Sequence, residues 1–289
     1  MASRYTRILM VVAVGLALAP AARASTIVWL NDLNSDVQFV LDADDPTTET
    51  EGMVSWLIDE VERMERQWFW FRLGDTGPER QISELAYQNH NAIDLNGEPG
   101  KDVLWVRYLG EGLQVDVTVT LVGGGEGSGK SDIAETIRIT NVSCDTLDLN
   151  FFQYADFELG GEETVEVTGA SGGEPGNTVY QQGAGGGRVA ETVVTRSNHT
   201  LAYHQAGLQD GSDLNDILKA LTDGDADDLT DASGPLSGDA VWGFQWQAEL
   251  EAGDTLIISK DKNVVPEPAT VFLMAAGTGL ALVMRRRRR

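Results

Sequence analysis

The sequence predicts an all-β fold: a jelly-roll-like β-sandwich of many short antiparallel strands, with one short helix. Between the two ends of the 289-residue chain lie many short runs rich in Val, Ile, Thr and aromatic residues, which favour strands. Turns rich in Gly, Asp and Asn separate these runs, as is typical of sandwiches and barrel-like double sheets. Because no linker divides this region, we expect one domain over residues 25–263.

Two of these runs predict strands most clearly. Positions 68–71 are four consecutive aromatic residues, which makes 67–73 a strand. Residues 113–121 alternate apolar and polar side chains, the pattern of a half-buried strand, and we expect them to form a hairpin with 103–109. Residues 59–66, in contrast, have the pattern of a helical turn. Further strands are expected at 26–30, 37–41, 53–58, 134–140, 147–154, 164–168, 179–180, 189–196, 200–205, 240–250 and 255–259.

One segment near residue 217 has helical periodicity. The apolar residues at positions i, i+3, i+4 and i+7 are Leu214, Ile217, Leu218 and Leu221. Ser212 or Asp213 would cap the start of this helix, and Gly224 suits its exit. We expect the helix to cross one open end of the sandwich.

The N-terminus has the three parts of a secretory signal peptide. Arg4 and Arg7 give a positive start, residues 8–18 are apolar, and 22–24 read Ala-Arg-Ala, a cleavage-site pattern. Residues 1–24 are therefore predicted to be a signal helix that directs the chain to the Sec export machinery.

The C-terminus has the pattern of a short membrane helix. Residues 269–284 carry no charge, and these sixteen residues would span about 24 Å as a helix, against about 30 Å of hydrocarbon. The five arginines at 285–289 should stay cytoplasmic, which places the body on the far side of the membrane. Residues 263–266 would be the tether to this transmembrane helix.

The motif Pro266, Glu267, Pro268, followed by the apolar helix and the arginine cluster, resembles a PEP-CTERM sorting signal. The resemblance covers residues 264–289 and implies a Gram-negative host that makes exopolysaccharide. It also implies that an exosortase-type membrane protease removes the tail, so that the protein is anchored in the inner membrane only transiently before it reaches the cell surface or extracellular matrix. An ordinary anchor that is never cleaved is the alternative.

The exported part is strongly acidic. Eight of the 21 basic residues lie in the two terminal signals, which leaves 13 basic against 45 acidic residues, a net charge of −32. This charge argues against nucleic acid as a partner and against direct binding to anionic surfaces. The single cysteine, Cys144, cannot form a disulfide within the chain.

Residues 124–131 match the phosphate-binding pattern G-x-x-x-x-G-K-[ST]. That motif needs a helix directly after the loop, but residues 133–140 have the pattern of a strand. We therefore interpret 124–131 as a hairpin loop and expect no ATP binding.

Asp223, Asp225 and Asp227 place carboxylates at alternating positions, as calcium loops do. However, Asp228 stands where an EF-hand loop has glycine, and Gly234 where it has a bidentate acid. These three residues are calcium candidates, a solvated acidic loop is the alternative, and no other cofactor is expected.

Trp68 and Trp70 would share one face of their strand, with the two phenylalanines on the other. If the phenylalanines face the core, the two tryptophans would form an exposed platform that stacks on sugars; core packing is the alternative. The aromatic residues of 242–246 share one face, which favours the core. Asp156 and Glu158 would share a face that either lines a groove or simply points outward.

The first functional hypothesis is an exported, non-enzymatic structural or adhesive component of the cell surface or exopolysaccharide matrix. The second is a carbohydrate-binding module that holds exopolysaccharide. The third is a secreted hydrolase, which should show a cleft with close carboxylates of raised pKa. His90, His199 and His204 are scattered in the sequence and suggest no shared site.

Overall fold

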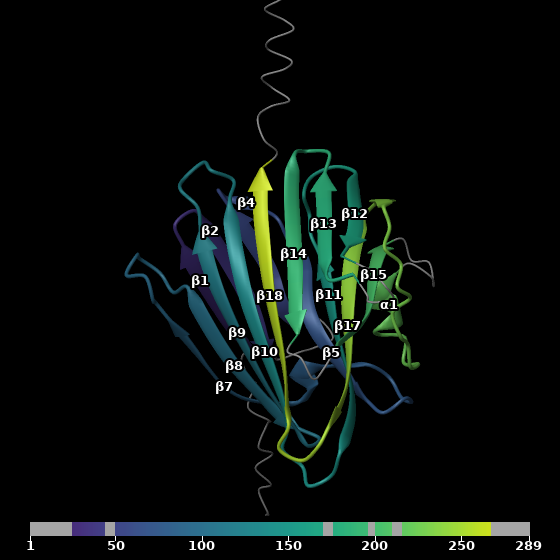
Figure 1. The fold of residues 1–289 in the computed structure, drawn as a ribbon. Helices are drawn as coiled ribbons and strands as arrows, with labels where there is room; N and C mark the ends of the chain where they lie inside the picture. Colours follow the sequence, from purple (N-terminus) through teal and green to yellow (C-terminus); the bar gives the residue numbers. More distant parts are fainter. Residues whose placement is uncertain (1–24, 44–49, 170–175, 196–199, 210–215, 267–289) are drawn as a thin grey trace, which may run out of the picture.

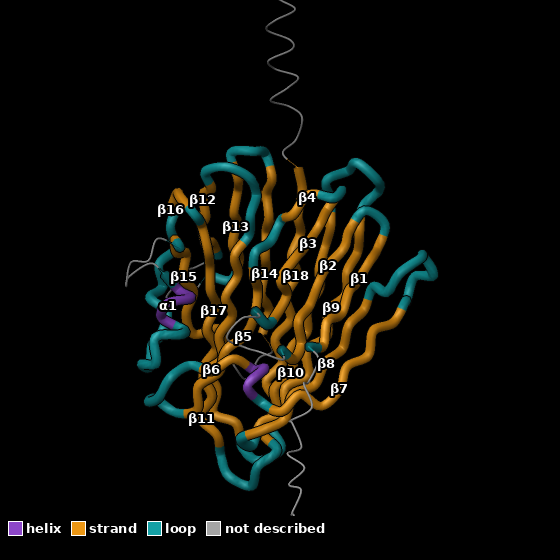
Figure 2. The backbone as a smooth tube through the Cα atoms, turned by 180° about the vertical axis from the view of Figure 1, so that it is seen from behind, coloured by secondary structure: helices purple, strands orange, loops and turns teal. Residues whose placement is uncertain are grey.

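The computed structural model of the protein describes residues 25–43, 50–169, 176–195, 200–209 and 216–266. They form two nine-stranded antiparallel sheets, A and B, packed face to face (Figure 1 and Figure 2). The predicted all-β sandwich is therefore confirmed. The predicted signal peptide and the predicted membrane segment 269–284 lie outside the described residues, and within the described part no helix is long and apolar enough to span a bilayer.

Sheet A has the order β1-β2-β3-β5-β11-β17-β15, with β4 paired to β3 and β6 to β5. Its strands are β1 (Thr26–Asp32), β2 (Ser35–Asp42), β3 (Gly52–Ile58), β4 (Val61–Glu62), β5 (Arg66–Leu73), β6 (Arg80–Gln81), β11 (Leu147–Asp156), β15 (Thr200–Leu208) and β17 (Ala240–Leu250). Sheet B has the order β16-β12-β13-β14-β18-β10-β9-β8-β7. Its strands are β7 (Ala86–Ile93), β8 (Val103–Gly110), β9 (Leu113–Gly123), β10 (Ser131–Asn141), β12 (Glu163–Thr168), β13 (Thr178–Gly183), β14 (Gly187–Thr195), β16 (Leu236–Gly238) and β18 (Thr255–Pro266).

Strand alternation decides which side chains enter the space between the sheets. On β11, Phe151 and Gln153 point inward, and Gln153 reaches Glu191 of sheet B, with Nε2 2.9 Å from Oε1. Phe152 and Tyr154 point to the outer face of sheet A. That face is itself covered near its centre, because the segment around η1 (Ile82–Glu84) and the residues after α1 (Ile217–Ala220) lie over it.

The interior contains an ionic cluster as well as an aromatic core. The Lys260 ammonium on β18 lies 2.6 Å from Glu135 Oε2 and 3.4 Å from Glu191 Oε1. Lys262 also pairs with Glu135, and all four side chains are at most 1% exposed. Gln67 of sheet A completes the contacts by donating from Nε2 to Glu135 Oε1 at 2.9 Å. We call these residues the inter-sheet ion cluster.

Burial acts on these charges in opposite directions. It disfavours the ionised form of Glu135, but the two lysines outweigh it and lower the pKa of Glu135 to about 2. Burial also lowers the pKa of Lys260, against the attraction of Glu135. The cluster is stable only while both its carboxylates and its ammonium groups are present.

Three local expectations are wrong. Residues 59–66 are not helical, because Asp59 and Glu60 have φ of 50° and 64° and turn the chain into β4. The region 263–266 is not a tether: Val264 pairs with Ser131 and Pro266 with Gly187, so these residues belong to β18. The short helix, which has four residues, lies against the outer face of sheet A at Gly243 and does not cross an open end of the sandwich.

That helix, α1, is capped by Asp216, whose Oδ1 accepts from the Lys219 amide at 3.0 Å. The expected caps, Ser212 and Asp213, lie outside the described residues. Ile217 and Leu221 are buried, as the periodicity predicted.

Candidate functional site

The surface exposure expected of Trp68 and Trp70 is wrong. Their side chains are 2% and 1% exposed. Trp68 lies under the η1 segment, where its Nε1 donates to Ser83 Oγ at 3.4 Å. Trp70 packs edge-on against Tyr154 and carries the Arg66 guanidinium 5.1 Å above its ring. Both faces of β5 are covered, so these tryptophans form no sugar platform.

The aspartates of the calcium candidate do not converge on one point. The amide of Asp225 donates to Asp223 Oδ1 at 2.9 Å, which closes a local turn. The Asp227 amide donates to Glu79 Oε1 at 3.0 Å. Within the described part of the chain, no three His, Cys, Asp or Glu side chains are grouped to hold a metal ion.

The loop at 124–130 joins β9 to β10, as predicted, and a strand follows it. Its backbone amides hold a carboxylate of the protein itself: Gly127 N and Gly129 N donate to Asp59 Oδ1 and Oδ2 at 2.6 and 2.7 Å. These hydrogen bonds lower the pKa of Asp59. Two of the amides that would face a phosphate in a P-loop are therefore occupied by Asp59, and those of Ser128 and Lys130 donate within the loop.

A Ser-His-Asp constellation, which sequence separation concealed, lies beside β15. His204 Nε2 is 2.8 Å from Ser233 Oγ, and His204 Nδ1 is 3.4 Å from Asp231 Oδ1. However, the Gly176 amide donates to Nδ1 at 3.1 Å. Because Nδ1 accepts, the neutral ring carries its proton on Nε2 and donates to Ser233. A general base needs the opposite tautomer, so this arrangement does not activate the serine.

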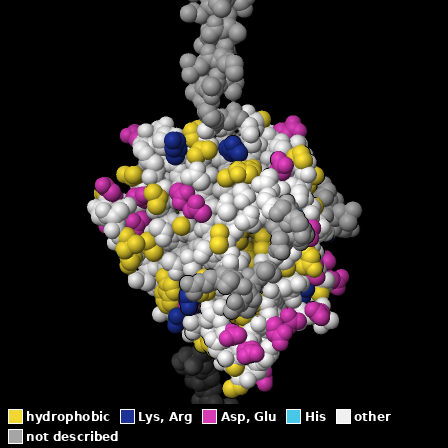
Figure 3. All heavy atoms as spheres, in the orientation of Figure 1, with side chains coloured by type: hydrophobic (Ala, Val, Ile, Leu, Met, Phe, Trp, Pro, Cys, Tyr) yellow, Lys and Arg dark blue, Asp and Glu magenta, His cyan; other side chains and the backbone are white. Residues whose placement is uncertain are grey.

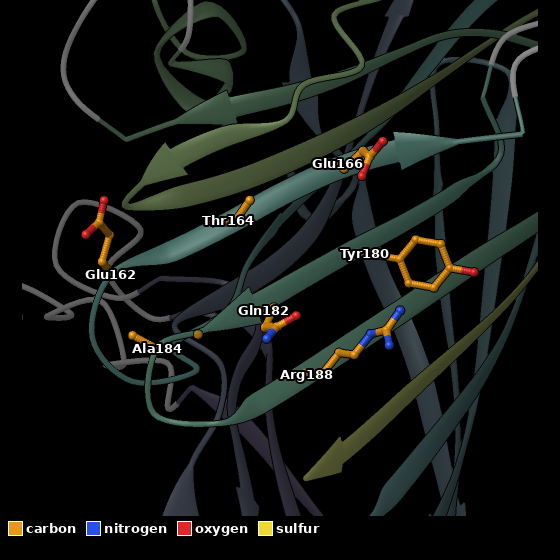
Figure 4. Close-up of a pocket in the computed structure, with 8 residues that line it drawn as sticks. Glu162, Thr164, Glu166, Tyr180, Gln182, Ala184 and Arg188 are labelled. Atoms are coloured by element: carbon orange, nitrogen blue, oxygen red, sulfur yellow. The ribbon is translucent and has the colours of Figure 1, made fainter. Parts of the chain in front are cut away.

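A polar groove lies on the outer face of sheet B (Figure 4). Its volume is about 540 Å³. It is lined by Glu162, Thr164, Glu166, Tyr180, Gln182, Gly183, Ala184 and Arg188. Strand register creates it: Glu166 of β12 lies beside Tyr180 of β13, and Gln182 beside Arg188 of β14. We call it the Tyr180 groove.

The groove combines an aromatic ring with charged and amide groups. Tyr180 is 37% exposed, and the Arg188 guanidinium lies 4.9 Å from its ring centroid. Arg188 and Gln182 supply hydrogen-bond donors, and Glu162 and Glu166 supply acceptors. Sequence reasoning missed this set because its members are spread over three strands and are brought together only by register.

A second depression, the Asp156 pocket, lies on the outer face of sheet A and has a volume of about 370 Å³. It is lined by Thr50, Val54, Glu65, Arg66, Tyr154, Asp156, Gln209 and Leu218. The Tyr154 hydroxyl donates to Asp156 Oδ2 at 3.0 Å. Burial raises the pKa of Asp156 to about 7, and Glu65 adds to the shift. Glu158, the expected groove partner of Asp156, is exposed and does not line this pocket.

The tail gives the clearest match to known proteins. A family model of the PEP-CTERM protein-sorting motif matches residues 264–289. The chain carries a PEP-CTERM sorting motif. This motif implies export, transient anchoring by the C-terminal tail and processing by an exosortase. Its first residues lie in β18, which ends at Pro266, whereas Glu267 and Pro268 lie outside the described residues.

The rest of the chain resembles solved structures in its fold alone. A candidate aldose 1-epimerase from Escherichia coli K12 has 8% identity and a TM-score of 0.51, with 84% of this chain and 100% of that chain covered. The Slr1438 protein from Synechocystis sp. PCC 6803 has 10% identity and a TM-score of 0.49, with 88% and 100% covered. A candidate kojibiose phosphorylase from the human microbiome has 9% identity and a TM-score of 0.44, with 89% of this chain but 33% of that chain covered. No curated protein matches by sequence.

Proposed function

We propose that the exported domain is a non-enzymatic component of the cell surface or exopolysaccharide matrix that binds glycan in the Tyr180 groove. The observation that carries this proposal is the groove itself, which gathers an exposed aromatic ring, donors and acceptors on one sheet face. Such a combination suits sugars, whose rings offer both apolar C–H surfaces and hydroxyl groups. The PEP-CTERM motif supports delivery outside the cell.

The charge distribution favours a neutral polysaccharide. The exported part has 13 basic and 45 acidic residues, so a polyanion would be repelled over most of its surface. Figure 3 shows acidic side chains spread over the face that bears sheet B, with a few basic ones between them. Within the groove, Glu162 and Glu166 offset the positive charge of Arg188.

Affinity electrophoresis through gels that contain the host exopolysaccharide tests the groove. We expect the full protein to be retarded, and the double variant Tyr180→Ala/Arg188→Ala to bind about tenfold more weakly, equivalent to about 1.4 kcal/mol. Arg138→Ala is the matched control, since Arg138 is exposed on β10 of the same sheet, outside the groove. Equal mobility of wild type and double variant would remove the groove from the proposal.

Delivery is tested by the intact mass of cell-associated and released protein. In a host with an exosortase, we expect the mature chain to lack the arginines at 285–289. A wild-type chain that keeps them would contradict sorting by this route.

The competing function is a secreted hydrolase, which Asp156 favours because its raised pKa suits a general acid and Glu65 lines the same pocket. A reducing-sugar assay on the host exopolysaccharide distinguishes the two functions. We expect no release of reducing ends. Release that disappears in Asp156→Asn would contradict the non-enzymatic proposal.

A further inference from the structure

We propose that the Asp156 pocket is a second carbohydrate site, which takes one neutral sugar residue on the face opposite the Tyr180 groove. Sugar binding in this pocket does not depend on the Tyr180 groove. A role in cross-linking glycans requires both sites and therefore rests on the proposed function.

The pocket is built by elements far apart in the sequence. Val54 comes from β3, Arg66 from β5, and Tyr154 and Asp156 from β11. Gln209 follows β15, and Leu218 lies in α1. A volume of about 370 Å³ is at the small end of the range for ligand sites, which suits a single sugar ring better than an extended chain.

The polar groups of the pocket are held in place but incompletely used. The Arg66 guanidinium stacks on Trp70 and donates from Nη2 to Gln81 Oε1 at 3.1 Å. Its Nε is buried and has no hydrogen-bond partner among the described residues. Asp156 is 4% exposed as a residue, and its carboxyl accepts from the Tyr154 hydroxyl. The Asp156 carboxyl lines the pocket and has acceptor capacity left, so a ligand hydroxyl can donate to it, whereas the enclosed Arg66 Nε is out of a ligand's reach.

The remaining lining residues match the two kinds of surface that a sugar presents. Glu65 and Gln209 bring a carboxylate and an amide, which can bond adjacent hydroxyl groups. Val54 and Leu218 bring apolar surface to the same pocket, which suits the C–H face of a ring. The pocket contains acidic as well as basic groups, so a neutral ligand avoids repulsion from either.

The two sites lie on opposite sides of the sandwich. Tyr154 and Asp156 alternate with the inward-pointing Gln153, so they face away from sheet B. Tyr180 and Gln182 alternate with the inward-pointing Gln181, so they face away from sheet A. Figure 1 and Figure 2 show these two outer faces from opposite directions. One molecule could therefore hold two glycan strands, which is the property of a cross-linker.

Saturation-transfer NMR on the full protein tests the pocket, with the methyl glycosides of glucose, galactose, mannose and rhamnose as probes. We expect at least one probe to bind at millimolar concentration, and Asp156→Leu to weaken its binding about tenfold or more. Asp148→Leu is the matched control, because Asp148 is an exposed carboxylate on the same strand. Gln209→Leu replaces Asp156→Leu if the latter does not fold.

The groove variant Tyr180→Ala/Arg188→Ala separates the two proposals. The probe signal should persist in this variant. Cross-linking by wild-type protein should increase the light scattering of an exopolysaccharide solution, and this increase should disappear when either site is altered. No probe signal from folded wild type, or equal signals from wild type and Asp156→Leu, would overturn the pocket even if the groove binds glycan. Unchanged gel retardation in Tyr180→Ala/Arg188→Ala, together with a retained, Asp156-dependent probe signal, would instead reject the groove alone.

Discussion

At the scale of single residues, the fold buries acids that it stabilises in their protonated form. Burial raises the pKa of Asp156 and of Glu163 to about 7 each. Both residues are less than 5% exposed, so ionisation of their carboxyls opposes folding.

These two groups contribute to the pH dependence of stability with a defined sign. Between about pH 4 and 7 they bind more protons in the folded state than in the unfolded state, so their contribution to the free energy of unfolding falls as pH rises and then levels off. Asp156→Asn should reduce this slope and stabilise the protein at pH 8 by roughly 2–4 kcal/mol, at about 1.4 kcal/mol per pKa unit. Urea unfolding at pH 4.5, 6 and 8 measures this, and identical slopes for wild type and variant would refute it.

The burial of Trp70 predicts a structural role rather than a binding role. Trp70→Ala should lower the free energy of unfolding by about 3–5 kcal/mol, because a large cavity remains between Tyr154 and Arg66. Trp29 is 42% exposed, so Trp29→Ala should cost less than about 1 kcal/mol. Chemical denaturation compares the two variants. Similar losses in both would show that Trp70 is not a core residue.

At the scale of elements, the sequence predicted strands better than their surroundings. The aromatic run of β5 and the alternation in β9 were sufficient to predict these two strands, since both patterns are local. β7 was missed because its residues are mostly polar and exposed, as an edge strand allows. The covered outer face of β5 was also missed. Period-two alternation says which side chains share a face, but whether a distant loop covers that face is a tertiary property.

The candidate sites show the same limit. Asp156 was singled out from its own strand, but its partners Arg66 and Gln209 come from other strands or beyond them. Tyr180 and Arg188 become neighbours only through the pairing of β13 with β14. A single sequence contains no signal for that register.

The hairpin loop at 124–130 should depend on Asp59 and not on its lysine. Asp59→Ala leaves the amides of Gly127 and Gly129 without their acceptor, so we expect faster hydrogen exchange in the loop and a lower Tm. Lys130→Ala should change neither, because Lys130 is exposed. Exchange followed by mass spectrometry measures both variants. Unchanged exchange in Asp59→Ala would show that the carboxylate does not order the loop.

At the scale of the whole molecule, the last strand of the described chain, β18, occupies the centre of sheet B. β18 lies between β14 and β10, and it brings Lys260 and Lys262 to the carboxylates of those two neighbours. Without β18, Glu135 and Glu191 would be left as buried anions.

Removing the two cations should therefore destabilise the domain strongly. Lys260→Met/Lys262→Met should destabilise the domain by at least about 3–5 kcal/mol, and additionally replacing Glu135 and Glu191 with Gln should recover most of the loss, because no unpaired charge then remains. Urea unfolding of the full chain measures both variants.

The control is Lys101→Met/Lys130→Met, which removes two exposed lysines and the same net charge. It should leave the unfolding midpoint nearly unchanged. A fourfold variant no more stable than Lys260→Met/Lys262→Met would show that packing, rather than charge balance, holds β18 in place.

The position of β18 also has a consequence for how faithfully the protein is made. The strand that is translated last stands in the middle of its sheet, and its final residue is the first proline of the sorting motif. A chain that ends before β18 would lack both the sorting motif and the central strand of sheet B. We therefore expect a completely folded chain to be one whose synthesis has already reached the sorting motif.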